Sequence, residues 1–258
     1  MAGISLSVEQ KVARIVLDRP AKLNSFNREM ALELQEALDA CVSNTEVRAV
    51  YITGSGKGFS AGQDLAEVVD PHGPGMDRIL KEHYNPIVRR IFRMPKPVVA
   101  AVNGVAAGAG ANIALCCDVV VAAASASFVQ AFSKIGLIPD SGGTWFLPRL
   151  VGWQRASALA MLGDKVTAAE AEQMGMVYKV YPDETFATAS WELAVKLAAM
   201  PTRGLALTKE ALQQSFTQTL DEQLHFEDIL QQQAAGTEDY REGVAAFLEK
   251  RPAVFKGK

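Results

Sequence analysis

Short, continuously apolar runs that end in glycine-rich turns recur along this chain, and they limit its fold more than any other feature. Three such turns read GSGKGFSAGQDL, NGVAAGAGAN and GLIPDSGGTW. Continuously apolar runs of this length are typical of strands in a sheet that is buried on both faces. Each glycine turn suits a corner between a strand and a helix. The recurring order of strand, strand and helix, without an exact repeat, predicts an α/β fold.

The helical pattern becomes dominant in the last third of the chain. Thr167 and Glu170 have the spacing of a helix capping box, and amphipathic segments follow them up to the C-terminus. We therefore expect an α/β core over residues 1–195 and a helical region over residues 196–258, with no flexible linker between them. The segment Asp70–Arg78 contains two prolines and two glycines, so it is expected to be a loop near a site.

The composition is that of an ordinary globular protein without a strong charge. The chain has 258 residues, 49% hydrophobic and 21% charged, and its net charge of −3 gives no electrostatic footprint for nucleic acid or an anionic membrane. Its three cysteines, Cys41, Cys116 and Cys117, fit neither a disulfide framework nor a metal site. Because no secretory signal and no apolar run of membrane-spanning length is evident, we expect a cytoplasmic protein without nucleic-acid or membrane partners.

A single carboxylate, Asp140, stands in the otherwise apolar and glycine-rich segment Lys134–Gly152, which is expected to be buried. Burying a carboxylate without a partner costs free energy, so Asp140 either holds a turn or takes part in chemistry. A structural aspartate before a pair of glycines is common. The residues alone leave both interpretations open.

The glycine-rich turns are not nucleotide-binding motifs. None fits the P-loop pattern, and GAGAN lacks the third glycine and the downstream acid of a dinucleotide fingerprint. Small residues do let backbone N–H groups approach a ligand closely. Two such groups aimed at one carbonyl oxygen would form an oxyanion hole. The alternative is that these turns are only corners between strands and helices.

A combination of motifs is more informative than any one turn. It comprises RPAKLNSF, GKGFSAGQDL, KPVVAAVNGVAAGAGANIAL, CDVVVAA and GLIPDSGGTWFLPRLVG. This combination resembles the crotonase, or enoyl-CoA hydratase/isomerase, superfamily, and the resemblance extends to the C-terminal DYREGVAAFLEKRPAVFKGK. It implies a superhelix of stacked strand-strand-helix units, a C-terminal helical region that forms homotrimers or hexamers, and an acyl-CoA thioester as the substrate.

The resemblance also implies roles for individual residues. The thioester oxygen would accept hydrogen bonds from the backbone N–H groups of Gln63 and Ala109, which would form the oxyanion hole. Contacts with CoA are implied for Lys22, Ala61, Asp64 and Leu65 of the same chain and for Phe247 and Lys250 of a neighbouring subunit.

The chain departs from the hydratase pattern of the superfamily at two positions. Hydratases carry a pair of glutamates that activate water, and the matching residues here are Asn112 and Phe132. Asp140 instead stands where several isomerase branches carry their catalytic acid. One carboxylate beside an oxyanion hole can move a proton between two carbons. We therefore expect an isomerase that needs no metal or redox cofactor.

Within the superfamily, the motifs FSAGQDL, HYNPIVRRI and AFSKIGLIPDSGGTWFLPR are most similar to isomerases that convert ring-1,2-epoxyphenylacetyl-CoA to its oxepin isomer in phenylacetate catabolism. Isomerisation of 3-enoyl-CoA to 2-enoyl-CoA is the same chemistry. The acyl pocket is expected to be lined by Tyr84, Asn112, Phe132 and Trp145. Two alternatives stay open: a hydratase that works through other residues, and a non-catalytic module that binds CoA or RNA.

Overall fold

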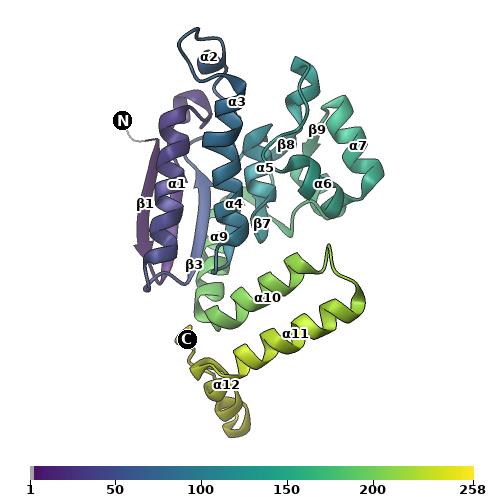
Figure 1. Cartoon of the computed structure of the whole chain (residues 1–258). Coiled ribbons are helices and arrows are strands. Elements are labelled where there is room, and N and C mark those ends of the chain that lie inside the picture. The colour runs from purple at the N-terminus through teal and green to yellow at the C-terminus, as the bar shows by residue number, and fades with distance from the viewer. Residues whose placement is uncertain (1–2) are drawn as a thin grey trace.

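Two β-sheets form the centre of the computed structural model, which describes residues 3–258 (Figure 1). The larger sheet has the strand order β1 (Ile4–Glu9), β2 (Val12–Leu17), β3 (Ala49–Gly54), β5 (Val98–Val102), β7 (Val119–Ala123) and β10 (Lys179–Tyr181). The smaller sheet has the order β4 (Gly58–Ser60), β6 (Val105–Ala107), β8 (Ser127–Val129) and β9 (Lys165–Thr167). All neighbours pair in parallel except β1 with β2 and β8 with β9.

The chain passes from the larger sheet to the smaller one three times in the same way. β3 is followed within a few residues by β4, β5 by β6, and β7 by β8, and each short strand leads into a helical segment. The predicted α/β fold of strand-strand-helix units is therefore confirmed. Because β4, β6 and β8 are parallel neighbours, their carboxyl ends meet along one edge of the smaller sheet.

The helical segments connect and cover the sheets. Before the C-terminal region they are η1 (Pro20–Lys22), α1 (Arg28–Ser43), α2 (Leu65–Val68), α3 (Met76–Arg78), the π-helix η2 (Ile79–Tyr84), α4 (Asn85–Arg93), α5 (Ala109–Leu115), η3 (Ala131–Ile135), α6 (Gly143–Val151), α7 (Trp153–Leu162), α8 (Ala168–Gln173) and α9 (Asp183–Ala199). The C-terminal region contains α10 (Thr202–Gln214), α11 (Leu220–Ala235) and α12 (Glu238–Glu249).

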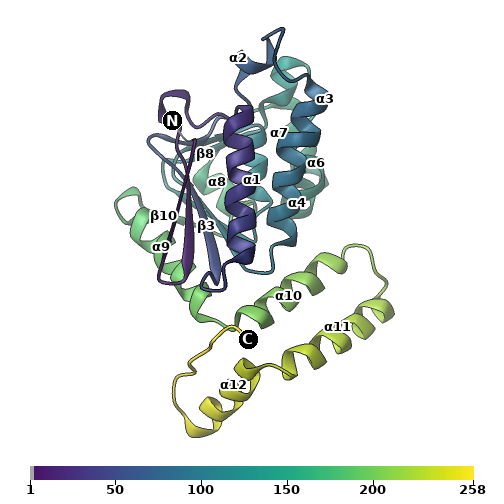
Figure 2. The same cartoon turned by 60° about the vertical axis from the view of Figure 1, so that its left-hand side comes forward.

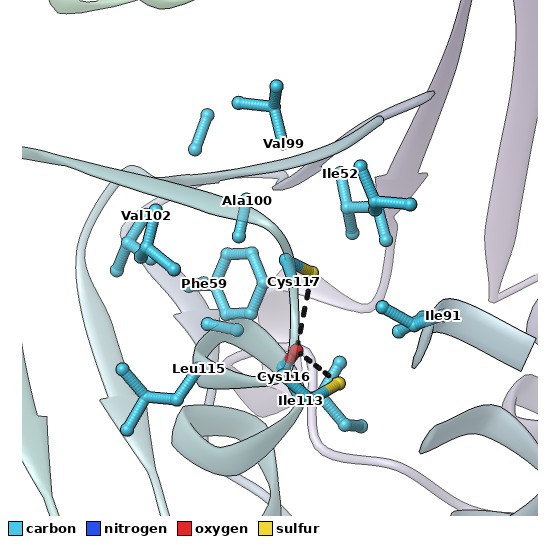
Figure 3. Packing of buried hydrophobic residues seen from close by; sticks show 14 of the residues in the cluster. Ile52, Phe59, Ile91, Val99, Ala100, Val102, Ile113, Leu115, Cys116 and Cys117 are labelled. Carbon is cyan, nitrogen blue, oxygen red and sulfur yellow. Dashed lines mark hydrogen bonds between the residues drawn. The ribbon is translucent and has the colours of Figure 1, made fainter. Parts of the chain in front are cut away.

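The hydrophobic core lies between the sheets and the helices. Figure 3 shows side chains from β3, β5 and α5 gathered around Phe59, together with Ile91 of α4. Cys116 and Cys117 are buried there, and both Sγ atoms lie within hydrogen-bonding distance of the Ile113 carbonyl oxygen, at 3.1 and 3.4 Å. All three cysteines are free and buried. On the opposite side of the larger sheet, α9 packs through the Tyr51 hydroxyl, 2.9 Å from Ser190 Oγ.

Three local expectations differ from the structure. The expected loop Asp70–Arg78 ends early, because α3 begins at Met76. The region expected to be mainly helical contains the strand β10, which pairs with β7. The first half of the segment Lys134–Gly152 is exposed rather than buried, and the Ile138 side chain is 79% exposed. The predicted capping box of Thr167 and Glu170 is confirmed at the start of α8.

The helices α10, α11 and α12 stand away from the sheets in both views (Figures 1 and 2). The last residues of the chain return from α12 to the core. There the buried guanidinium of Arg48 donates to Thr202 Oγ1 at 2.9 Å, to the Phe255 carbonyl at 2.7 Å, and to the Met200 carbonyl. Asp239 of α12 accepts hydrogen bonds from the backbone N–H groups of Lys256 and Gly257. Residues 1 and 2 of the expected core region lie outside the described residues.

Candidate active site

The edge formed by the carboxyl ends of β4, β6 and β8 is where the predicted site residues meet. Gln63 follows β4, Ala109 follows β6 as the first residue of α5, and Phe132 follows β8. Ligands of sheets with parallel strands bind outside the carboxyl ends of the strands. The fold therefore brings together residues that are far apart in the sequence.

The backbone N–H groups of Gln63 and Ala109 lie side by side at this edge. Each follows a glycine with positive φ, Gly62 at +86° and Gly108 at +52°. A Cβ atom on Gly62 would come within 2.8 Å of the Ala107 carbonyl oxygen and 3.2 Å of the Ala109 nitrogen, so only glycine permits this approach. Within residues 3–258, neither N–H group donates to another protein group. Both N–H groups are thus free to donate to a ligand, which is a requirement for the predicted oxyanion hole.

Asp140 lies in the turn before α6 and is half-buried. Its Oδ1 accepts a hydrogen bond from Ser141 Oγ at 2.8 Å. Burial raises the pKa of the Asp140 carboxyl above its usual value of 3.8, and the hydrogen bond from Ser141 opposes this increase only in part. Ser141 itself has a φ of +51°, a conformation that costs free energy for a residue other than glycine. The turn is therefore held in a strained form that presents a carboxylate of raised basicity.

Asn112 connects the Asp140 turn to helix α5. It lies one turn after Ala109, is fully buried, and donates from Nδ2 to the Asp140 carbonyl oxygen at 2.8 Å. Its Oδ1 accepts from Gln130 Nε2, also at 2.8 Å. Both polar groups of Asn112 are thus bonded to protein. Phe132, the other residue at a hydratase glutamate position, is buried with its ring next to Gly108.

Tyr84 reaches the same edge from the end of η2. Its ring is fully buried, and its hydroxyl donates to Gln63 Oε1 at 2.8 Å. Gln63 Nε2 in turn donates to Glu67 Oε2 at 2.8 Å. Burial, reinforced by the negative charges of Asp140, Glu67 and Asp64, raises the pKa of the Tyr84 phenol well above its usual value of 10. Tyr84 is therefore a neutral hydrogen-bond donor.

The residues expected to contact CoA fall into two groups. Ala61, Asp64 and Leu65 flank Gln63, and the Ala61 N–H donates to the carbonyl of Leu23, the residue after Lys22. Phe247 lies in α12 and Lys250 caps the end of this helix, which lies at the far end of the molecule from α2 (Figure 1). Within one chain, the structure does not bring Phe247 and Lys250 to Asp140.

Trp145 lies away from the candidate site. Its indole packs edge-on against Phe92, Phe146 and Phe216, and the Arg149 guanidinium lies 4.0 Å from its ring centre. These aromatic rings line a cavity of about 390 Å³ beside Leu115 to Val119, at the opposite end of α5 from Ala109. The expected acyl-pocket residues Tyr84 and Phe132 reach the Gln63–Ala109 edge, whereas Trp145 does not.

Two residues of the site were missed from the sequence. Gln130 and Glu67 orient Asn112 and Gln63 through hydrogen bonds. For Gln130, the only indication in the sequence was a glutamine near the end of the apolar run ASFVQAF. For Glu67, the sequence contained no indication of a role. Residues 3–258 contain no group of three His, Cys, Asp or Glu side chains placed to hold a metal ion. No helix in the same range is long and apolar enough to cross a bilayer.

Comparison with known proteins gives a consistent result. The family model described as Enoyl-CoA hydratase/isomerase matches residues 7–258. The 1,2-epoxyphenylacetyl-CoA isomerase of Escherichia coli is 51% identical over the full length of both chains. A probable enoyl-CoA hydratase of Rhodobacter capsulatus is 44% identical over 99% of this chain and 98% of its own. A crystal structure of a putative enoyl-CoA hydratase/isomerase from Mycobacterium abscessus is 38% identical, with a TM-score of 0.94 over 99% of this chain and 100% of its own.

Proposed function

The chain belongs to the enoyl-CoA hydratase/isomerase family of enzymes, which act on acyl-CoA thioesters, and from this premise we propose that it moves a proton from the α-carbon to the γ-carbon of such a thioester. The observation that carries the proposal is the pairing of one carboxylate, Asp140, with the two free N–H groups of Gln63 and Ala109. Asn112 links the two parts of this arrangement.

The reaction would begin with the thioester oxygen accepting hydrogen bonds from Gln63 and Ala109. Asp140 then removes a proton from the α-carbon, and negative charge develops on the oxygen as an enolate. Preorganised donors of this kind are worth roughly 3 kcal/mol each. The raised pKa of Asp140 brings its basicity closer to that of the carbon acid. Asp140 finally returns the proton to the γ-carbon, and neither a metal nor a redox group takes part.

The surroundings of Asp140 favour isomerisation over hydration. Activating water requires a second polar group with a free acceptor. Asn112 carries no carboxylate, and its fully buried amide is already bonded to Gln130 and to the Asp140 carbonyl. The Phe132 ring offers only carbon atoms. Hydratases are nevertheless among the relatives, so the addition of water to crotonyl-CoA is the activity to measure in parallel.

For the substrate, we propose ring-1,2-epoxyphenylacetyl-CoA, with 3-enoyl-CoA as a second substrate of the same chemistry. The support is the 51% identity to the E. coli isomerase of that name and the buried aromatic rings of Tyr84 and Phe132 beside the oxyanion donors. The epoxide equilibrates with an oxepin, and transfer of the acetyl α-proton to the ring fixes the oxepin product. We also propose a homotrimer or hexamer in the cytoplasm, where the unpaired cysteines would stay reduced.

The test is an assay with three thioesters: the ring-1,2-epoxide, a 3-enoyl-CoA and crotonyl-CoA. We expect turnover of the first two and very slow hydration of the third. Robust hydration of crotonyl-CoA with no turnover of the epoxide would replace the isomerase assignment by a hydratase. Binding of CoA thioesters without turnover of any of the three would favour a non-catalytic module.

A further inference from the structure

We propose that Asn112, oriented by Gln130, is a positioning residue that fixes Asp140 relative to the oxyanion hole. The proposal rests on the proposed function, because it assumes that Asp140 is the base. The geometry is direct. One residue of α5, Ala109, supplies an oxyanion donor, and Asn112, one helical turn later, holds the backbone of the residue that carries the carboxylate.

The hydrogen bonds fix the orientation of the Asn112 amide. The Asp140 carbonyl can only accept, so Asn112 Nδ2 must face it, and Asn112 Oδ1 is then left to accept from Gln130 Nε2. The same carbonyl accepts a second hydrogen bond, from the Gly143 N–H at 2.8 Å. Asn112 and Gln130 are buried, and the hydrogen bonds that join them to the Asp140 carbonyl favour this one arrangement, although Gln130 Oε1 itself has no partner among the described residues.

The sequence of the Asp140 turn is adapted to this contact. A Cβ atom on Gly143 would lie 2.3 Å from Asn112 Nδ2, so α6 can approach Asn112 only with glycine as its first residue. The turn before it uses positive φ at both Ser141 and Gly142. Glycine at position 143 and asparagine at position 112 are therefore required together.

A glutamate at position 112 would not support the contact with the Asp140 turn. A glutamate there, as the hydratase pattern has, carries no donor for the Asp140 carbonyl and would place a second negative charge beside the turn. With asparagine instead of glutamate, position 112 has no acid that could activate water, but it has an N–H donor that binds the Asp140 carbonyl.

The test uses Asn112→Asp, which keeps the shape of the side chain and loses the donor, and Gln130→Leu, which removes only the group that orients Asn112. With 3-enoyl-CoA as substrate, we expect kcat of Asn112→Asp to fall by about tenfold to a hundredfold and KM to change by less than about twofold, because small displacements of a base cost rates of this size. Gln130→Leu should show a smaller loss in the same direction. The acid limb of the pH–rate profile of Asn112→Asp should move to higher pH, because a second carboxylate raises the pKa of Asp140.

A double-mutant cycle separates positioning from general damage. In an Asp140→Asn background, Asn112→Asp should lower the residual rate by less than about twofold, because no base remains to be positioned. Asn103→Asp is the matched control, since Asn103 also donates to backbone carbonyls, those of Gly56 and Gly58, at the other end of β6. A full loss in the Asp140→Asn background, or an unchanged kcat in Asn112→Asp, would overturn the proposal.

A second measurement does not depend on activity. Amide hydrogen exchange over residues 137–144 should become faster in Asn112→Asp and stay unchanged in Asn103→Asp. If the unmodified enzyme turns over none of the thioesters, the proposed function fails, while the exchange rates still decide whether Asn112 holds the Asp140 turn. Unchanged exchange over residues 137–144 in Asn112→Asp would refute that role.

Discussion

At the scale of single residues, the proposed role of Asp140 as the base predicts how activity depends on pH. Only the ionised form can accept a proton, and burial raises its pKa above 3.8. We therefore expect kcat/KM to fall on the acid side with a midpoint above 3.8. The midpoint is read from a pH–rate profile with 3-enoyl-CoA. A profile that stays flat down to pH values near 3.8 would contradict the role of Asp140 as the base.

Replacing Asp140 by asparagine is expected to separate activity from stability. Asp140→Asn keeps the volume and loses the base, so kcat should fall by at least about 10²-fold while CoA-ligand affinity is preserved. Near-normal turnover would exclude Asp140 as the proton carrier.

The same variant is expected to be more stable than the parent protein at neutral pH. The folded-state pKa of Asp140 is raised, so its ionised form is disfavoured by folding. The stability that the protonated Asp140 carboxyl contributes is fully present below its unfolded-state pKa. This contribution is lost as the pH rises through its folded-state pKa. The advantage of Asp140→Asn in urea unfolding should therefore be largest at neutral pH and shrink towards pH 3.8. If the stability advantage of Asp140→Asn grew as the pH fell, the pKa of Asp140 would be lowered by folding rather than raised.

The local backbone was predictable from the sequence where glycines determine it. Gln63 and Ala109 each follow a glycine of positive φ, and Gly62 lies close to the Ala109 nitrogen, which is the geometry that their predicted role requires. Side-chain roles were less accessible, because they depend on partners from distant elements. Asn112, which is expected to line the acyl pocket, makes hydrogen bonds with Gln130 and the Asp140 carbonyl that the sequence did not indicate. Trp145 was expected there as well, and it packs against Phe92 at the other end of α5.

At the scale of elements, η2 shows how one proline positions a site residue. Pro86 near the start of α4 has no N–H group to donate to the Glu82 carbonyl four residues earlier. The helix widens to a π-helix there, with the Asn85 N–H bonded to the Leu80 carbonyl. Gln35 Nε2 of α1 supplies the missing donor to the Glu82 carbonyl at 2.7 Å. The wider turn directs Tyr84 to Gln63, as π-helices at functional sites often do.

Gln35 is therefore expected to stabilise the π-helix. Gln35→Leu should lower the free energy of unfolding by about 1–3 kcal/mol, the cost of leaving a buried carbonyl unpaired. Urea unfolding measures the loss. Gln154→Leu on the exposed start of α7 is the matched control and should change stability by less than about 0.5 kcal/mol. Equal decreases in the free energy of unfolding of both variants would contradict a specific role of Gln35 in the π-helix.

The larger elements could be predicted better than the short ones. Strands of five or six apolar residues, such as β3 and β5, carry a clear pattern in the sequence. The three residues of β10 carry too little pattern, and the strand exists because its neighbour β7 offers a free edge. η2 was also missed, because the letters ILKEHY alone do not indicate a π-helix, which depends on Pro86 and on the contact with Gln35 of α1.

At the scale of the whole molecule, the C-terminal helices present apolar side chains that the chain itself leaves exposed. Leu212, Phe216, Leu220, Leu224 and Phe247 are all more than half exposed, and Phe247 is 83% exposed. Exposed patches of this kind usually mark an interface, and the proposed partner is a second copy of this chain.

Removing the residues after Ala235 should therefore lower both oligomer content and CoA affinity, since Phe247 and Lys250 are expected to reach the CoA of a neighbour. Light scattering gives the mass of the intact and shortened proteins, and titration with a CoA thioester gives the affinity. A monomeric intact protein with full activity would contradict both the oligomer and the shared site.

The attachment of the last residues to Arg48 and Asp239 makes this protein sensitive to proteolytic trimming. A carboxypeptidase that stopped at Val254 would spare every residue proposed for catalysis. It would also remove the Phe255 carbonyl and the two N–H groups that Asp239 holds. Arg48 Nη1 would then lose its acceptor, and α12 would lose the hydrogen bonds between Asp239 and the end of the chain. If stored enzyme dissociates into monomers, mass spectrometry of the whole protein should accordingly show the loss of its final four residues, Phe255 to Lys258.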